Sequence, residues 1–237
     1  PEFLREGEAI RDFMYPDRVV IGTSSKKANN ILKNLYLPLT KKTNKYFHTS
    51  RRAAELIKYA SNAFLATKIT YINEISNLCE KLNIDVTDIS IGIGSDERIG
   101  SRFLRAGPGY GGSCFPKDTR ALLSISKKFK TNLSIVKSTV KSNDDRIKYL
   151  QNRIRNIMKN NLNDKKITFL GVTLKAGTDD MRDASSLKLI PYLTRKGSRI
   201  SYYDPTGIKS EFNKKKVVYY NNIKDACKNS DLLIIHT

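Results

Sequence analysis

The chain contains no tryptophan, and only three cysteines and two histidines occur among its 237 residues. Cys79, Cys114 and Cys227 lie far apart in the sequence. That spacing excludes a disulfide framework and a Cys-x-x-Cys metal site, so we expect no metal centre and a reducing, cytoplasmic location. No apolar run approaches the roughly 18 residues that a membrane-spanning helix needs, so we expect no membrane partner. Hydrophobic residues still make up 39% of the chain, enough for a core of ordinary size.

Acidic residues are scarce relative to basic ones. The chain has 43 Lys and Arg against 23 Asp and Glu, a formal net charge of +20. The basic runs, such as Lys41-Lys42 and Lys214-Lys215-Lys216, are short and scattered and form no single stripe with interleaved aromatic residues. We therefore expect no nucleic-acid partner, although a basic surface would attract an anionic small substrate.

Glycine and proline are absent from residues 50–91, and apolar residues recur there at helical spacing. This pattern predicts one long helix from about 50 to 83, which we expect to bridge domains or subunits. The other expected helices are residues 28–35, 86–93, 119–129, 135–159, 184–196 and 223–228. The expected strands are residues 18–22, 166–170, 199–203, 217–220 and 232–235, with a connector at 38–49 and a long loop at 171–183. The alternation of strands and helices from Lys165 onward indicates an α/β domain with a parallel sheet.

Residues 107–112, Gly-Pro-Gly-Tyr-Gly-Gly, match the pattern G-x-G-x-x-G. A dinucleotide-binding fingerprint follows a strand and opens a helix. Here the helix-like residues 102–106 precede the segment and Pro116 follows it closely. We therefore reject the match as a dinucleotide fingerprint.

Cys114 ends this glycine-rich segment, and Lys117 and Asp118 follow three and four residues later. A nearby cation raises the thiolate population of a cysteine. A carboxylate one helical turn away can position water or accept a proton. The spacing thus fits a nucleophile site, but a buried free cysteine in a tight turn is an equally good interpretation of spacing alone.

Residues 107–118 resemble the catalytic-cysteine segment of the UDP-glucose/GDP-mannose dehydrogenase family. Residues 1–7, 54–64, 96–100 and 174–183 also resemble segments of that family, in the same order, so that the resemblance covers essentially the whole chain. Residues 96–100 and 112–118 are most similar to the branch that acts on UDP-glucose. Ala176-Gly177 departs from the Pro-Asn that the family often has, which bears on loop shape rather than chemistry.

The resemblance implies an α/β protein in three parts. Residues 1–49 would be the tail of a Rossmann NAD-binding domain, residues 50–160 a central helical domain that carries Cys114 and dimerises, and residues 161–237 an incomplete UDP-sugar-binding domain with a Rossmann-like parallel sheet. It also implies an excerpt of a longer protein, whose dinucleotide fingerprint lies upstream. We therefore expect the excerpt by itself to be inactive.

The resemblance further implies oxidation of the C6 alcohol of a nucleotide sugar to a carboxylate, with two hydrides passed in turn to two NAD molecules. Cys114 would be the nucleophile that forms a thiohemiacetal and then a thioester. Lys58 would stabilise the oxygen anion with Asn62 beside it, since a spacing of four residues puts both on one helix face. Asp118 and Glu2 would serve thioester hydrolysis, and the sequence leaves open which is the base. Asp118 could also simply stabilise the start of a helix.

Binding residues are likewise implied by the resemblance. Substrate contacts are expected from Phe3, Leu4, Arg5, Glu6, Arg98, Arg105, Tyr110, Gly111, Leu174 and Lys175. Cofactor contacts are expected from Glu6, Cys114, Lys117 and Arg182. The expected cofactor is NAD and the expected substrate UDP-glucose. The expected protein partner is a second copy of the chain, paired through the long helix, with Arg98 reaching into the neighbouring site.

Two other interpretations stay open. GDP-mannose or a UDP-N-acetylhexosamine could be the substrate, because the contacts that recognise the base are less informative than the catalytic motifs. A catalytically silent scaffold or basic interaction protein is an alternative of another class. The joint presence of Cys114, Lys58, Asn62 and Asp118 speaks against it.

Overall fold

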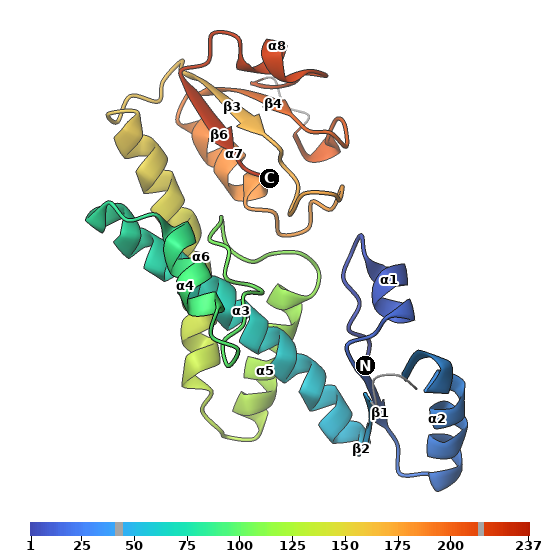
Figure 1. Cartoon of the computed structure of the whole chain (residues 1–237). Coiled ribbons are helices and arrows are strands. Elements are labelled where there is room, and N and C mark those ends of the chain that lie inside the picture. Colours follow the sequence, from blue (N-terminus) through green and yellow to red (C-terminus); the bar gives the residue numbers. More distant parts are fainter. Residues whose placement is uncertain (41–44, 213–215) are drawn as a thin grey trace. The chain divides into compact units, whose positions relative to one another are not determined.

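The structure is a computed structural model of the chain, and it describes residues 1–40, 45–212 and 216–237. The middle of the expected connector at 38–49, the run Lys41-Lys42 and most of the run Lys214-Lys215-Lys216 lie outside the described residues. The chain divides into two compact units, residues 1–64 and residues 65–237, and each is described by itself. Figure 1 labels their elements.

The first unit is a small parallel pair of strands joined by a helix. Its elements are α1 (Ala9–Met14), β1 (Val19–Gly22), α2 (Lys26–Thr40), β2 (Tyr46–Thr49) and the beginning of α3 (Arg51–Leu82). β1 pairs in parallel with β2, and α2 packs on both strands. This β-α-β arrangement is the repeating unit of a Rossmann sheet.

The long helix predicted at 50–83 is confirmed by α3. Gly22 shows how tightly the end of β1 meets the beginning of that helix. A Cβ atom at Gly22 would lie 2.6 Å from the Ala54 Cβ and 2.9 Å from the Arg51 Cα. Only glycine fits there without a shift of the backbone, because real Cβ atoms keep a greater distance from other heavy atoms.

Local expectations for the first unit were less accurate. The sequence predicts a helix only at 28–35, but α2 spans Lys26–Thr40 and contains Pro38 near its carboxyl end. β2 lies where a connector was expected, and α1 was not expected at all. Both are short, and β2 is largely exposed, so neither has an apolar period long enough to read from the sequence.

The first part of the second unit is helical. It contains the rest of α3, α4 (Val86–Gly94), α5 (Phe115–Lys128) and α6 (Ser134–Ile157), with α5 packed on α6. α5 begins four residues earlier than predicted, with Pro116 in its first turn, where a missing N–H costs nothing. The expected helical residues 102–106 form no helix, and Phe103 has a φ of +66°.

The carboxyl-terminal part is a parallel four-stranded sheet, as predicted. Its elements are β3 (Lys166–Leu170), α7 (Ser186–Arg195), β4 (Arg199–Tyr203), the 3-10 helix η1 (Ser210–Phe212), β5 (Val217–Tyr219), α8 (Ile223–Cys227) and β6 (Leu232–Ile235). The strand order is β5-β4-β3-β6, and every pair is parallel. Figure 1 shows this sheet with its helices. The side chains of its core are fully buried: Ile167, Phe169, Ile190, Leu193 and Tyr202.

Strand order places a topological switch point between β3 and β6. From β3 the chain proceeds outward to β4 and β5, and then returns to the other side of β3 with β6. Ligands of open α/β sheets bind beyond the carboxyl ends of the strands at such a point. The loop after β3, residues 171–185, begins at this edge.

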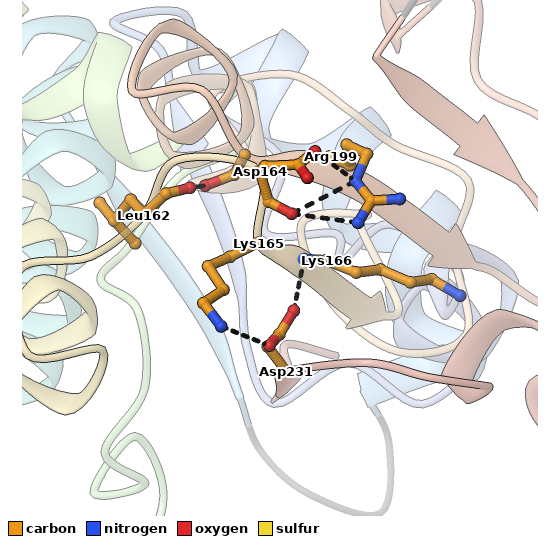
Figure 2. A network of polar contacts seen from close by, with 7 residues as sticks. Leu162, Asp164, Lys165, Lys166, Arg199 and Asp231 are labelled. Atoms are coloured by element: carbon orange, nitrogen blue, oxygen red, sulfur yellow. Dashed lines mark hydrogen bonds and ion pairs between the residues drawn. The ribbon is translucent and has the colours of Figure 1, made fainter.

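Ion pairs and backbone hydrogen bonds link the amino-terminal ends of the strands, opposite the switch point (Figure 2). Asp231 accepts hydrogen bonds from the Lys165 Nζ at 2.9 Å and from the Lys166 N–H at 2.8 Å. Arg199 donates to the Asp164 carbonyl oxygen at 3.1 Å and pairs with its carboxylate at 3.0 Å. These contacts join the starts of β3, β4 and β6, so they help to set the register of the sheet.

Among the described residues, no helix is long and apolar enough to cross a membrane.

Candidate active site

The glycine-rich segment of the second unit is an irregular loop that presses against the loop after β3. A Cβ atom at Gly111 would lie 2.4 Å from the Asp183 carbonyl oxygen and 2.8 Å from a Leu174 methyl carbon. The Gly112 N–H donates to the Arg182 carbonyl oxygen at 2.9 Å. Two segments more than sixty residues apart in sequence therefore meet backbone to backbone, and the small residues of the first make this contact possible.

Cys114 is the residue that precedes the first turn of α5. Its side chain is half-buried, and its Sγ lies 3.6 Å from the Ser113 Oγ. The amino terminus of a helix carries a partial positive charge and free N–H groups. Negative charge is favoured at this end of a helix, so the position of Cys114 is compatible with a nucleophilic role.

Asp118 lies one turn after Cys114, and its N–H donates to the Cys114 carbonyl oxygen at 2.9 Å. The Asp118 side chain is only 1% exposed, whereas that of Lys117, whose Nζ is 3.2 Å from the Asp118 Oδ1, is 72% exposed. A buried carboxylate needs such a partner, because desolvation disfavours an isolated charge. The roles expected for Lys117 and Asp118 toward the Cys114 sulfur stay predictions.

Aromatic rings enclose the beginning of α5. The Tyr110 ring packs edge-on against Phe115 with a centroid distance of 6.2 Å, and Phe103 does the same from another side at 6.1 Å. Tyr110 is buried, and burial raises the pKa of its hydroxyl. The rings therefore fix the turn that carries Cys114 through apolar packing as well as hydrogen bonds.

The loop after β3 carries three more of the predicted residues. Leu174 packs on Gly111 and Gly112, and its N–H donates to the Asp180 carbonyl oxygen at 2.8 Å. Lys175 is exposed. Arg182 is exposed as well, and its Nε donates at 2.9 Å to the buried Asp180 carboxylate. The structure thus brings the glycine-rich loop, which holds Tyr110 and Gly111 and ends just before Cys114, against the loop that carries Leu174 and Arg182.

Two predicted arginines lie on the surface of this unit. Arg98 follows α4, where its guanidinium is paired with the Asp96 carboxylate at 2.5 Å. Arg105 precedes the glycine-rich loop and is exposed. Both could meet an anionic ligand, since neither guanidinium is buried.

The first unit contains the remaining candidates. The Lys58 Nζ donates to the Glu2 carbonyl oxygen at 2.7 Å and lies 3.7 Å from the Glu2 Oε1. The Phe3 ring has the Arg18 guanidinium 3.9 Å and the Lys58 ammonium 5.5 Å from its centroid. Such cation–π contacts hold the first residues of the chain on α3.

Lys58 and Asn62 lie on one face of α3, as their spacing predicted, because residues 51–82 are continuous helix. Asn62 is buried. Arg5 makes a two-pronged contact with the Asp12 carboxylate at 2.9 and 2.6 Å, which joins the segment Phe3–Glu6 to α1. A rigid helix face with a cation and an amide is the kind of arrangement that can stabilise an oxygen anion.

Sequence reasoning missed the residues that hold the glycine-rich loop from behind. Asn73 of α3, together with Asn143 and Arg146 of α6, makes hydrogen bonds to the backbone of that loop. The available signal was weak, because an isolated asparagine or arginine inside a helix is usually solvated. Asp180, the buried partner of Arg182, was also missed.

The fold and the site together define a class of α/β protein in which a glycine-rich loop, directly before Cys114 and α5, meets the loop that follows the first strand of a parallel sheet. Three domain models of one family match the chain in order: the NAD binding domain at residues 1–40, the central domain at 52–145 and the UDP binding domain at 168–237. The chain belongs to the UDP-glucose/GDP-mannose dehydrogenase family. The expected domain limits, 1–49, 50–160 and 161–237, stay a prediction.

The relatives and solved structures that the chain resembles agree with this assignment. It is 45% identical to a UDP-glucose 6-dehydrogenase of Rickettsia bellii over 100% of the chain and 55% of that relative, and 48% identical to one of Rhizobium meliloti over 89% and 48%. A solved UDP-glucose dehydrogenase from the archaeon Pyrobaculum islandicum superposes with a TM-score of 0.93 at 33% identity, over 100% of the chain and 54% of that structure. The chain spans about half the length of the curated relatives it matches.

The residues around the two loops fit the NAD that this family uses. NAD carries an anionic pyrophosphate, and a protein binds such a group with cations whose head groups remain accessible. Lys117 and Arg182 are exposed cations, one in the first turn of α5 and one in the loop after β3. Their donor chemistry therefore fits the cofactor.

Proposed function

We propose that the protein to which this chain belongs oxidises the C6 alcohol of UDP-glucose to the carboxylate of UDP-glucuronate. The observation that carries the proposal is the position of Cys114 at the start of α5, one turn before the buried Asp118. The names of the relatives, UDP-glucose 6-dehydrogenase, support the choice of substrate. NAD, when bound, supplies the chemistry of hydride acceptance, once for each of the two oxidation steps.

The cysteine explains how an alcohol can lose two hydrides in turn. Loss of a hydride and a proton converts the alcohol to an aldehyde. The Cys114 thiolate then adds to the aldehyde carbon and forms a thiohemiacetal, whose carbon again bears a hydrogen that can leave as hydride. Its loss gives a thioester, and water cleaves the thioester to the acid and the free thiol.

The proposed roles of the other catalytic residues follow from charge and burial. Lys58 and Asn62, on one face of α3, stabilise the oxygen anion of the adduct by positive charge and hydrogen bonding. Asp118, a buried carboxylate one turn from the sulfur, positions or deprotonates the hydrolytic water. Glu2, whose backbone and carboxylate contact Lys58, is the second candidate for that role.

The proposed binding residues keep their sequence assignments. UDP-glucose is bound by Phe3, Leu4, Arg5, Glu6, Arg98, Arg105, Tyr110, Gly111, Leu174 and Lys175. NAD is bound by Glu6, Cys114, Lys117 and Arg182. The accessible guanidinium and ammonium groups in both sets support the assignment, since both ligands carry a diphosphate.

We also propose a homodimer paired through α3. Within the second unit, Tyr71, Leu78 and Leu82 are 52%, 55% and 58% exposed. Their spacing of seven and four residues puts them on one face of the helix. Exposed apolar residues in such a row are typical of an interface between subunits. A cytoplasmic location fits the three free cysteines, because the proposed chemistry needs a reduced thiol.

Counting NADH tests the proposal. The full-length protein is given limiting UDP-glucose and excess NAD, and we expect two NADH for each sugar and no UDP-glucuronate from Cys114→Ala. One NADH per sugar would mean that oxidation stops at the aldehyde, which contradicts the role of Cys114. Two NADH with GDP-mannose or a UDP-N-acetylhexosamine, and none with UDP-glucose, would keep the chemistry and change the substrate. No NADH with any nucleotide sugar would favour a scaffold.

A further inference from the structure

The backbone of the glycine-rich loop is held from α6 by one side-chain amide. The Tyr110 N–H donates to the Asn143 Oδ1 at 2.8 Å, and the Asn143 Nδ2 donates to the Tyr110 carbonyl oxygen at 3.1 Å. The side chain thus satisfies both backbone groups of Tyr110, as a neighbouring strand would. Only an amide offers a donor and an acceptor side by side, and glutamine would be longer by one methylene.

Gly109 leaves the space that this contact requires. It has a φ of +114°, and a Cβ atom there would lie 2.8 Å from the Asn143 Oδ1. Any side chain at position 109 would therefore collide with the amide or force it away. The contact of Asn143 with the loop therefore depends on glycine at position 109, although the two residues lie 34 positions apart in the sequence.

We call the two hydrogen bonds between Asn143 and the Tyr110 backbone the first clamp of the loop. A second clamp holds the loop at Gly107. Its N–H donates to the Asn73 Oδ1 at 2.8 Å, and its carbonyl oxygen accepts from the Arg146 Nε at 3.1 Å. Arg146 also donates to the Asn73 carbonyl oxygen at 3.3 Å and to the Asn77 side chain. Burial lowers the pKa of this guanidinium, and its hydrogen bonds compensate for part of the lost hydration. Two long helices, α3 and α6, thereby fix two points of the loop.

Hydrogen bonds rather than apolar packing fix the loop on this side. A pocket of about 230 Å³ lies behind it, lined by polar residues that include Asn73, Glu74, Asn77, Asn143 and Arg146. A pocket of that size and polarity has room for water. Water does not impose a geometry on the loop, so the two clamps must do so.

We propose that Asn143 is a positioning residue that sets where the Cys114 sulfur meets the aldehyde, an inference that rests on the proposed function. Tyr110 lies four residues before Cys114, and its ring packs on Phe115, the first residue of α5. A shift of the Tyr110 backbone is therefore passed on to the sulfur through both the chain and the ring. A nucleophile displaced by about 1 Å can lose on the order of a hundredfold in rate.

The proposed chemistry separates this role from general stability. The first hydride leaves before the thiolate adds, whereas the second leaves only after it. Loss of the clamp should therefore slow the second hydride transfer and spare the first. A merely structural role would slow both transfers equally, or neither.

Two variants of the full-length protein test the proposal. Asn143→Asp keeps the shape and the acceptor but sets an oxygen against the Tyr110 carbonyl oxygen. Asn143→Ala removes both contacts, and we expect it to fold because Asn143 lines a pocket from which water can replace the amide. The matched control is Lys141→Ala, an exposed position on the same helix.

NADH is followed in a single turnover, with enzyme in excess over UDP-glucose. At enzyme concentrations that saturate UDP-glucose binding, we expect for both Asn143 variants a first phase like that of the wild type and a second phase about 10- to 100-fold slower. The control should keep both phases. Unchanged phases in both variants, or two phases slowed by the same factor, would overturn the proposal.

A measurement without substrate separates this proposal from the proposed function. Alkylation of Cys114 by iodoacetamide is measured by peptide mass spectrometry, with Cys79 and Cys227 as references in the same sample. Both Asn143 variants should change the Cys114 rate by about threefold or more, because the sulfur has moved relative to the start of α5. An unchanged rate would count against positioning. A wild type that gives no second NADH would count against the proposed function alone.

Discussion

His236, directly after β6, is a largely buried titratable side chain. Its Nε2 lies 2.6 Å from the Ser185 Oγ, and its ring packs on Phe169 with a centroid distance of 6.3 Å. Burial lowers the pKa of the imidazole to about 4. The folded protein therefore holds His236 in its neutral form at the carboxyl ends of the strands, where the loop after β3 also begins.

This histidine should make stability depend on pH. The unfolded state has an ordinary pKa near 6.5 and takes up a proton below that pH, whereas the folded state does so only near 4. Stability is therefore complete above pH 6.5 and is lost as the pH falls toward 4, by up to about 3 kcal/mol. Urea unfolding at pH 7 and pH 4.5 should show this loss in the wild type and a smaller one in His236→Gln. Equal losses in both proteins would contradict it.

Single residues were predictable where a motif identified them. Cys114, Lys117 and Asp118 stand together in one segment, so their proximity along the chain could be read from the sequence alone. Asn143 and Arg146 could not, because their partners at Gly107 and Tyr110 lie more than thirty residues away in the sequence. A contact between a side chain and a distant backbone leaves no local pattern in composition or period.

Among the elements, the contact between the glycine-rich loop and the loop after β3 determines the shape of the candidate site. We expect Gly111→Ala to disturb it, because the added methyl group would meet the Asp183 carbonyl oxygen and Leu174. Overpacking of this kind costs roughly 1–3 kcal/mol. Activity should fall about tenfold or more, because the displaced loop misplaces Cys114.

The matched control for this substitution is Gly92→Ala. Apart from its chain neighbours and the backbone of its own helix, no described atom lies within 4 Å of the position of its Cβ, and alanine favours a helix over glycine by about 1 kcal/mol. Thermal unfolding and initial rates of the two variants are compared. If Gly111→Ala were as stable and as active as Gly92→Ala, the close approach of the two loops at Gly111 would have no effect on stability or activity, contrary to this prediction.

Elements with a long apolar period were predicted well. α3, α6 and the strands of the carboxyl-terminal sheet lie close to their expected ranges. The short elements were not: α1 and β2 span six and four residues, and no period can be read over so few. α5 begins earlier than the expected residue 119, because Pro116 lies in its first turn, where proline is favoured.

At the scale of the whole molecule, the exposed row on α3 predicts the oligomeric state. Leu78→Glu would put a charge into the proposed interface, where burial without a partner is costly. We expect the wild type to be a dimer and Leu78→Glu to dissociate at least about tenfold more readily in sedimentation equilibrium. Ile135→Glu, at an exposed position on α6, is the control and should leave the dimer intact. A Leu78→Glu protein that dimerises like the wild type would contradict the proposed interface.

The proposed function depends on a covalent bond between the sugar and Cys114. The direct test is to mix the full-length protein with UDP-glucose and NAD, stop the reaction with acid within one turnover, and map the modified peptide by mass spectrometry. The other two free cysteines, Cys79 and Cys227, serve as internal references. The account predicts a UDP-glucuronyl thioester on the peptide that contains Cys114 and none on Cys79 or Cys227. Full conversion to UDP-glucuronate with no adduct at any time, or an adduct on another cysteine, would contradict it.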